Sequence, residues 1–233
     1  MIVSRINSLL QSLFGVRIAR ARRTFDYARK MLMKGACIDF VIDGGANQGQ
    51  WATEVKKAFP DLDIISIEPI LNAFEILQSE ASKYSRWIAI NAALGEEEST
   101  LIMHVASNDG QSSSLLKPKD HLEYYPTVSF NASQETRVIT LDSLQIPHDK
   151  KVFLKLDLQG YELIALRGAN NLLEKVVAIE LEMTTIQMYQ GQSTFLEVAA
   201  HLAECGFEIF SFADAFRGPD GRSIYIDVLF RRT

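Results

Sequence analysis

Short apolar runs alternate with amphipathic helical stretches along the chain from residue 38 onward. The runs are rich in Ile, Val and Phe, as buried strands are. They predict strands over residues 38–43, 63–68, 87–92, 151–157 and 176–182. Strands that alternate with helices in this way are typical of βαβ units and of a mostly parallel sheet.

The stretches between these runs carry one apolar stripe each, which is the pattern of a helix that packs on a sheet. Trp51, Val55 and Phe59 recur at every fourth residue until Pro60 ends the pattern. The same spacing predicts further helices, marked by the stripe Ala73, Ile76 and Leu77, by the residues after Gly160, and by the stripe Phe195, Val198, Ala199 and Leu202.

Two more strands are predicted near the end of the chain, over residues 207–212 and 224–231, and Gly206 before them is a predicted helix cap. The turn at residues 218–221 between them is too short for a crossover between parallel strands, so the last strand is expected to be antiparallel. The sequence thus predicts an α/β, Rossmann-like fold with a seven-stranded, mostly parallel sheet and an antiparallel last strand.

Two regions depart from this rhythm. Residues 96–150 hold alternating pieces at residues 100–105 and 136–141 around a polar stretch, which predicts a β-rich insertion over one face. At the N-terminus, apolar residues recur at helical spacing among arginines, the pattern of a basic helix. We therefore predict a basic helical extension over residues 1–34 and one folded domain over residues 35–233 that carries the insertion.

The charge of the chain divides at the same boundary. The 233 residues carry a formal charge of −5, with 47% hydrophobic and 23% charged residues, as in ordinary globular proteins. Residues 1–34 hold eight basic side chains and one acid, so the remaining 199 residues carry −12. A basic nucleic-acid-binding domain is therefore not expected. Three interpretations of the extension stay open: docking on the acidic body, which we favour, a homo-oligomer contact, or weak contact with an anionic membrane surface.

Further classes are excluded by what the sequence lacks. No stretch reaches the ~18 consecutive apolar residues of a transmembrane segment, and polar residues near the N-terminus interrupt any signal-peptide core. A cytoplasmic location is therefore expected. Cys37 and Cys205 have no metal-ligand spacing, so neither a zinc site nor a disulfide framework is expected.

The end of the first predicted strand carries an acid followed by a glycine turn. Asp43 precedes Gly45 and Gly49 in the spacing D-x-G-x-x-x-G, with Asn47 inside the turn. Ligands of open α/β sheets bind at the carboxyl ends of strands, where glycine lets the backbone approach them. A carboxylate here would repel a pyrophosphate and attract a cation. S-adenosylmethionine carries a sulfonium and an ammonium group, so we expect these residues to bind it, with Asp43 facing its amino-acid end.

Polar residues at other strand ends fit the same cofactor. Glu68 ends the second strand 25 residues after Asp43, where a carboxylate can accept hydrogen bonds from both ribose hydroxyls. Asn91, at the end of the third strand, and Ser113, in the insertion, are placed to contact the adenosine. A purely structural role on a turn is the alternative for both.

Three stretches resemble the FkbM-type methyltransferases, a family of class I, S-adenosylmethionine-dependent enzymes. They are VIDGGANQGQWA at residues 41–52, SSSLL at 112–116 and FLKLDLQGYELIALRGA at 153–169. In the third stretch Gln159 stands where the family pattern often has Glu. The resemblance implies the class I fold, this cofactor and, usually, O-methylation of a hydroxyl. Weaker similarities extend it over nearly all of the chain beyond the extension, at residues 140–144, 179–183 and 221–232.

Two carboxylates at the ends of later strands are the catalytic candidates. An alcohol at neutral pH needs a general base or a metal ion to accept a methyl group. Asp157, which ends the fourth strand, is the first candidate, although Asp157 and Glu162 could instead only cap the next helix. Glu182 is expected to join Asp157 around the acceptor or a divalent metal, with only one of Glu180 and Glu182 reaching the site. No residue is assigned as a metal ligand.

The acceptor is expected to be a small molecule or a glycan, bound beneath a lid built from residues 105–135. His121 could reach it from this lid, but a solvated loop is the favoured interpretation, and Lys155 is expected to face a neighbouring helix. Two other functions stay open: an NAD-dependent oxidoreductase, against which the absence of G-x-G-x-x-G argues, and a non-catalytic binding module that kept the fold.

Overall fold

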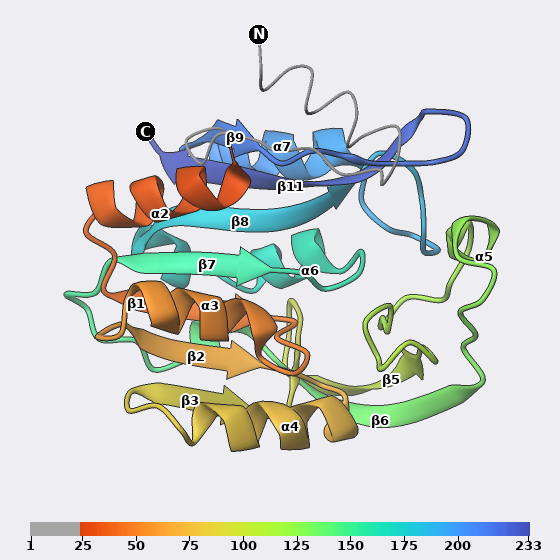
Figure 1. Cartoon of the computed structure of the whole chain (residues 1–233), viewed down its shortest axis with the longest axis horizontal. Helices are drawn as coiled ribbons and strands as arrows, with labels where there is room; N and C mark the ends of the chain where they lie inside the picture. Colours follow the sequence, from red (N-terminus) through yellow and green to blue (C-terminus); the bar gives the residue numbers. More distant parts are fainter. Residues whose placement is uncertain (1–23) are drawn as a thin grey trace, which may run out of the picture.

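The computed structural model describes residues 24–233, and a central sheet of eight strands runs through them (Figure 1). The sheet order is β10-β11-β8-β7-β1-β2-β3, and β9 pairs with β11 as well. The strands are β1 (Phe40–Gly44), β2 (Asp63–Ile67), β3 (Trp87–Ile90), β7 (Val152–Leu156), β8 (Val176–Thr184), β9 (Phe207–Phe212), β10 (Phe216–Arg217) and β11 (Ser223–Arg232).

The strand directions confirm the predicted Rossmann-like fold. Neighbouring strands from β3 to β8 are parallel. The last strand, β11, runs antiparallel to β8 over the register from Tyr225↔Thr184 to Arg231↔Ala178. Seven of the strands match predicted ones, and the eighth, β10, is a two-residue strand that pairs with β11.

Helices cover both faces of this sheet, so its strands are buried from both sides. Val41, Phe153 and Ala178 point to one face, where they form a core with α2, α3 and α4. Ile42 and Leu154, on the opposite face, pack with α6, α7 and the short helix η3. The helices are α2 (Phe25–Gly35), α3 (Gln50–Ala58), α4 (Leu71–Ala81), α6 (Glu162–Arg167), η3 (Leu172–Glu174) and α7 (Phe195–Glu204).

Local sequence signals explain where these helices begin and end. Thr194 caps α7 in a reciprocal capping box with Glu197, and Gly206 follows its end with φ +82, the predicted left-handed cap. The predicted stripe on α4 is only partly buried: Ala73 and Leu77 face the core, whereas Ile76 is 49% exposed. The spacing predicted the helix correctly, but it placed Ile76 on the buried face, and this residue is exposed.

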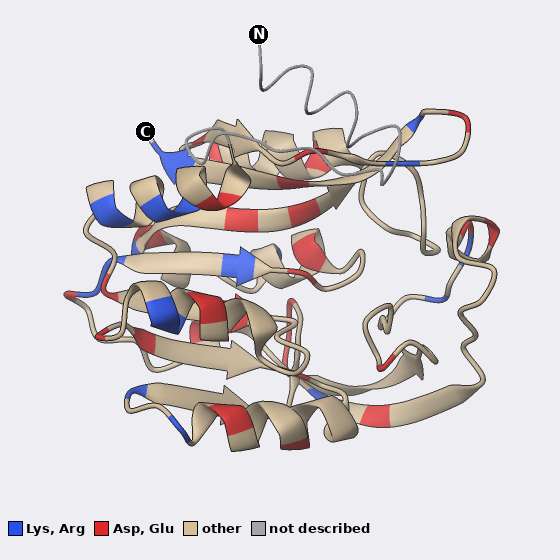
Figure 2. Cartoon of the chain, viewed as in Figure 1, with Lys and Arg blue, Asp and Glu red and all other residues tan. Residues whose placement is uncertain are grey.

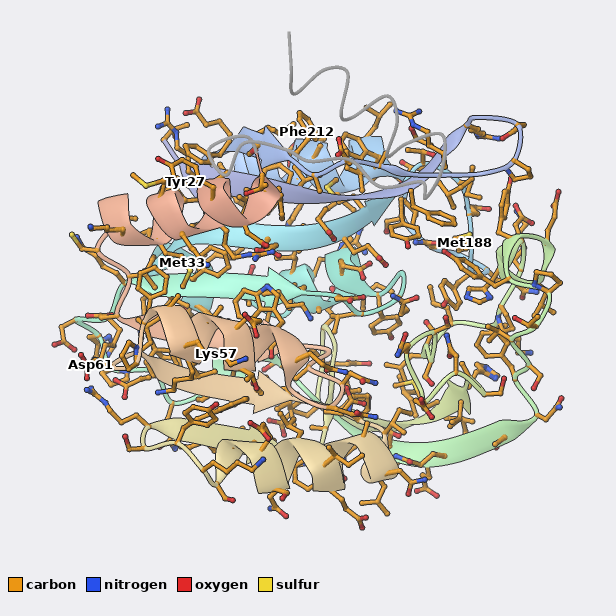
Figure 3. All side chains as sticks on the ribbon, viewed as in Figure 1. Tyr27, Met33, Lys57, Asp61, Met188 and Phe212 are labelled. Carbon is orange, nitrogen blue, oxygen red and sulfur yellow. The ribbon has the colours of Figure 1, made fainter. Side chains whose placement is uncertain are left out.

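The insertion forms a second, three-stranded sheet with the order β4-β6-β5. It continues as a long segment with α5, which lies beyond the carboxyl ends of β7 and β8 in Figure 1. A bridge between Pro118 and Tyr189 ties this segment to the loop after β8, where Met188 also lies (Figure 3). The elements are β4 (Ala93–Leu94), β5 (Ser99–Val105), α5 (His121–Tyr124), β6 (Ala132–Ile139) and η2 (Leu141–Ser143).

The described part of the predicted extension is helix α2. Its residues Leu32 and Met33 are buried, and Met33 lies between the helix and the sheet (Figure 3). The apolar stripe from Ile6 to Phe14 lies outside the described residues. Within residues 24–233, the structure contains no helix with the length and apolar character that crossing a membrane requires.

Candidate active site

A cavity of about 580 Å³ opens at the carboxyl ends of β1, β2, β7 and β8, beneath the insertion. It is lined by six of the predicted site residues: Gly45, Asn47, Glu68, Ser113, Asp157 and Glu182. The remaining three, Asp43, Gly49 and Asn91, are not among its lining residues. The structure thus brings four of the seven cofactor candidates and both catalytic candidates to one cavity.

The glycine turn lies directly against the end of β7. Gly45 has φ +71, and a Cβ atom there would stand 1.8 Å from the backbone oxygen of Asp157. The amide of Asp157 in turn donates to the carbonyl of Gly44 at 3.1 Å. Gly49 packs against helix α4 instead, where a Cβ atom at this position would meet Leu77 at 2.9 Å.

Asp43 is fully buried and belongs to a polar row that crosses the sheet. The strand register places Ser66, Asp43, Lys155 and Glu180 side by side on β2, β1, β7 and β8. Asp43 accepts a hydrogen bond from the Ser66 hydroxyl at 3.0 Å and pairs with the Lys155 ammonium at 3.2 Å. The carboxylate of Asp43 is therefore directed to Ser66 and Lys155.

The expectation that Lys155 faces a neighbouring helix is wrong. Its ammonium lies at the cavity and also donates to the carbonyls of Gly44 and Gly45, at 3.3 and 2.9 Å. Burial lowers the pKa of Lys155, but Asp43 and Asp157 outweigh burial and raise it above its ordinary value. Lys155 is therefore a fixed positive charge beneath the glycine turn. Figure 2 shows this basic band on β7 next to acidic bands on β8.

Glu68 holds together the loops that follow β1 and β2 at the cavity. Its carboxylate accepts the backbone N–H groups of Asn47 at 2.7 Å and Ile70 at 2.8 Å. Burial raises the pKa of Glu68 to about 7, although these two hydrogen bonds lower it. A carboxylate has about four acceptor positions, so two remain for ligand hydroxyls. Asn91 donates to the carbonyls of Glu68 and Pro69, at 2.9 and 3.1 Å, and so fixes the backbone of this loop.

Asp157 and Glu182 lie on either side of one amide. The Gln159 side-chain nitrogen donates to Asp157 at 2.8 Å and to Glu182 at 2.9 Å, and its oxygen accepts from the Tyr189 hydroxyl at 2.9 Å. Burial and the neighbouring Asp157 and Asp227 raise the pKa of Glu182 well above its ordinary value. The pair is thus half-buried, acidic and bridged by one amide.

Glu162 stands in the first turn of α6, but its carboxylate accepts from the loop before the helix, and the N-cap residue Tyr161 makes no side-chain capping bond. Its carboxylate accepts the N–H groups of Leu158 at 2.7 Å and Gly160 at 3.2 Å, which closes the loop between β7 and α6. Burial raises the pKa of Glu162 to about 7. Asp157, in contrast, directs its carboxylate to the side chain of Gln159.

Both acids of β8 line the cavity, so the expectation that only one would reach it is wrong. Glu180 accepts two hydrogen bonds from Arg29 of α2, at 2.5 and 2.6 Å, and one from the Trp51 indole at 3.1 Å. Arg29 was not predicted as a site residue. Its position among the arginines of the extension gave no signal that it would reach β8.

Aromatic rings form the other side of the cavity. His121 is 1% exposed, so its expected place in a solvated loop is wrong. Its ring lies 4.9 Å from that of Tyr125 and 5.6 Å from that of Tyr189, and burial lowers its pKa. Tyr125 and Tyr225 also line the cavity, and both rings stack on that of Phe216, with centres 5.7 and 4.9 Å away. Sequence reasoning missed Tyr189 and Tyr225, because no motif separates them from ordinary core tyrosines.

The described residues contain no group of three or more His, Cys, Asp and Glu side chains arranged to hold a metal ion. What the cavity offers is a glycine turn, a partly occupied carboxylate for hydroxyl groups, an acidic pair and aromatic walls. This arrangement suits a ligand with hydroxyl and cationic groups together with a second ligand next to it.

Known proteins share features of this chain. The curated protein Methyltransferase 1 of Beauveria bassiana (strain ARSEF 2860) is 25% identical over 227 residues, covering 86% of this chain and 88% of its own. Magnesium protoporphyrin IX methyltransferase from Synechocystis PCC 6803, solved with bound S-adenosylmethionine, covers 99% of this chain and 96% of its own with a TM-score of 0.48 at 8% identity. TehB from Haemophilus influenzae covers 97% of this chain and 67% of its own with a TM-score of 0.49 at 8% identity.

The family comparison covers the core of the fold and the cavity. The model of the Methyltransferase FkbM domain matches residues 43–209, from the acid at the end of β1 to the middle of β9 and well over half of the chain. All three stretches that carry the sequence resemblance lie in this range or begin just before it. The chain therefore belongs to the FkbM family of S-adenosylmethionine-dependent methyltransferases.

Proposed function

We propose that this protein transfers the methyl group of S-adenosylmethionine to a hydroxyl group of a small-molecule or glycan acceptor. The observation that carries the proposal is that Asp157 and Glu182 line the same cavity as the cofactor candidates Gly45, Asn47 and Glu68. The cavity volume of about 580 Å³ lies within the range of small-molecule sites.

The cofactor side is assigned to the loops after β1 and β2. Gly45 leaves room for the cofactor to cross the turn, and Glu68 has acceptor positions left for the ribose hydroxyls. Ser113 accepts the N–H of Ala106 at 2.9 Å, which leaves its own hydroxyl proton for the adenosine. When bound, S-adenosylmethionine supplies an electrophilic methyl group on a positively charged sulfur.

The acceptor side is assigned to the aromatic walls and the acidic pair. Carboxylates accept hydrogen bonds from hydroxyl groups, and aromatic rings pack against apolar faces. Tyr125, Tyr189 and Tyr225 line the cavity together with Asp157 and Glu182. This combination favours an acceptor that carries hydroxyl groups on an apolar frame.

In the proposed reaction the cavity would hold the acceptor oxygen against the methyl group that bound S-adenosylmethionine would supply, and S-adenosylhomocysteine would be the leaving group. The hydroxyl proton passes to Asp157, and the product is a methyl ether. Lys155, fixed beneath the glycine turn, pairs with Asp43 and so helps to hold this end of β7. Alignment and proton acceptance are the two contributions of the chain.

The test is methyl transfer from radiolabelled S-adenosylmethionine to a panel of sugars and natural-product alcohols. We expect Asp157→Asn to lower turnover by about 10²- to 10⁴-fold, because the hydroxyl loses its proton acceptor. The affinity for S-adenosylhomocysteine, measured by calorimetry, should stay nearly unchanged.

Asp214→Asn is the matched control, since Asp214 lies exposed in the loop after β9. Its turnover should equal that of the unchanged protein. Wild-type turnover in Asp157→Asn would refute the role of Asp157. A chain that binds the cofactor, methylates no acceptor and keeps its biological role after this substitution would be a binding module.

A further inference from the structure

Gln159 lies at the centre of the acidic pair and is held there by the insertion. Its backbone has φ +52, a left-handed conformation that is rare outside glycine. Its carbonyl accepts a hydrogen bond from the Ser114 hydroxyl at 2.8 Å. The Tyr189 hydroxyl lies between this side chain's oxygen, at 2.9 Å, and the Ser112 carbonyl, at 2.8 Å, and its one proton serves both acceptors. The serine run of the insertion therefore fixes both the backbone and the side chain of Gln159.

The orientation of the Gln159 amide is determined by its neighbours. Its nitrogen has two protons, and the two acceptors within reach are Asp157 and Glu182. The reverse orientation would place the amide oxygen against two carboxylates, a repulsive contact. Only the observed orientation gives each carboxylate one N–H and lets the oxygen accept from Tyr189.

Two carboxylates that share one site ordinarily need a proton or a cation between them. Asp157 and Glu182 are each partly exposed, but both accept from one amide nitrogen and so lie close together. The charge of Lys155 acts on both acids, while its ammonium makes its ion pair with Asp43. The Gln159 amide bridges the pair with two hydrogen bonds and brings no charge of its own. A glutamate at position 159, as in the family pattern, would instead place another carboxylate between the two, with no N–H to donate.

We propose that Gln159 is a positioning residue that takes the place of a bridging cation, so that this chain holds Asp157 and Glu182 together without a divalent metal ion. The corollary is that the single change Gln159→Glu creates a divalent-metal site from residues 157, 159 and 182. The acceptor-facing role of the pair rests on the proposed function, whereas the metal-binding corollary does not.

The first experiment measures binding of Mn²⁺ alone to the full chain by calorimetry. Carboxylate oxygens are the ligands that Mn²⁺ prefers. Gln159→Glu should bind Mn²⁺ at least about tenfold more tightly than the unchanged protein, as three carboxylates replace two. Gln111→Glu is the matched control, because Gln111 lines the cavity from the exposed part of the insertion; it should bind no more tightly than the unchanged protein.

Equal Mn²⁺ affinity of the unchanged protein and Gln159→Glu would overturn the proposal, and so would loss of turnover in the unchanged protein on adding a chelator. Absence of methyl transfer to every acceptor would refute the proposed function and leave the Mn²⁺ result standing. The two failures are therefore distinguishable.

A second variant decides the question if Gln159→Glu does not fold. Gln159→Met keeps the length of the side chain but removes both N–H donors. The unbridged pair then needs a proton, so the acidic limb of the pH profile of turnover should move to higher pH, with S-adenosylhomocysteine affinity unchanged. A pH profile identical to that of the unchanged protein would show that the amide does not bridge the pair in function.

Discussion

At the residue scale, Gly45 is the closest contact between the turn after β1 and the end of β7. A Cβ atom there would collide with a backbone oxygen, which cannot rotate away as a side chain can. Gly45→Ala should therefore lower the free energy of unfolding by clearly more than the roughly 1–2 kcal/mol that a left-handed backbone costs a non-glycine residue. It should also displace Asp157 and weaken S-adenosylhomocysteine binding.

Gly221→Ala is the matched control for this prediction. Gly221 has φ +83 but no atom within 4 Å of the position of its Cβ. Gly221→Ala should lower the free energy of unfolding in urea by about 1–2 kcal/mol, which is the cost of the left-handed backbone alone. The affinity for S-adenosylhomocysteine should stay unchanged. Equal costs for the two variants would contradict the steric argument.

The sequence could place residues at strand ends but could not assign their contacts. The alternation along β7 puts Lys155 on the same face as Phe153, which packs against helix α3. That alternation suggested a helix as the neighbour of Lys155. The actual neighbour is Asp43, and it follows from the register between β1 and β7, which no single-sequence pattern contains. Gln159 is similar: its bridging role depends on Glu182 in β8 and on Tyr189 in the following loop.

At the element scale, helix α2 is attached to the polar row of the sheet. Negative and positive side chains alternate along the row Asp43, Lys155 and Glu180. Arg29 adds a fourth, positive residue next to Glu180. Its guanidinium also lies 5.6 Å from the ring centre of Trp51 and 5.3 Å from that of Phe25. This one side chain therefore couples α2, α3 and β8 at the edge of the cavity.

Arg29→Met should loosen α2 from the sheet. Among the described residues 24–233, removal of Arg29 leaves the buried Glu180 carboxylate with the Trp51 indole as its one hydrogen-bond donor. We expect a loss of about 3 kcal/mol in the local stability of the helix. Hydrogen exchange followed by mass spectrometry should show faster exchange of the α2 amides, with little change in α4.

Lys30→Met is the control on the same helix, since Lys30 is exposed. Its α2 exchange should match that of the unchanged protein. Unaltered exchange in Arg29→Met would mean that the apolar residues Leu32 and Met33 hold the helix without the ion pair.

The elements that periodicity predicted are those long enough to show a period. The stripe on α3 and the apolar run of β7 each span several residues and were confirmed. The strands β4 and β10 contain two residues each, too few for any alternation to be visible. The sequence could not place the start of α2 for another reason. Its mixture of apolar and basic residues is the same as that of the segment before it, so no change in composition marks the boundary.

At the scale of the whole molecule, the two sides of the cavity differ in how they are assembled. The side that we propose for the cofactor comes from consecutive strand–loop–helix units, so a motif such as the glycine turn could point to it. The rest of the cavity joins segments distant in the sequence, as in the hydrogen bonds of Tyr189 to Ser112 and of Arg29 to Glu180. Sequence reasoning therefore named residues of the glycine turn but not Arg29 or Tyr189.

The buried acids also make the stability of the molecule depend on pH. Burial raises the pKa of Glu162 to about 7, above the 4.5 of an ordinary glutamate, so the folded chain holds this proton more tightly than the unfolded chain does. The contribution of Glu162 to the free energy of unfolding is complete below 4.5, its pKa in the unfolded chain, and is lost as the pH rises through about 7. The difference of 2.5 pKa units corresponds to about 3 kcal/mol. Glu68, whose pKa is also raised to about 7, acts in the same direction.

Glu162→Gln removes the Glu162 contribution, because the amide is neutral at every pH while its oxygen can still accept the N–H of Leu158. As the pH rises from about 5 to about 8, the unchanged protein should lose up to about 3 kcal/mol of unfolding free energy that Glu162→Gln does not lose. Urea unfolding of both proteins at the two pH values measures this difference. Glu75→Gln, which removes an exposed carboxylate from α4, should change stability equally at both pH values. If Glu162→Gln kept the pH slope of the unchanged protein, the slope would arise elsewhere, with the Glu182 and Asp227 pair as the next candidate.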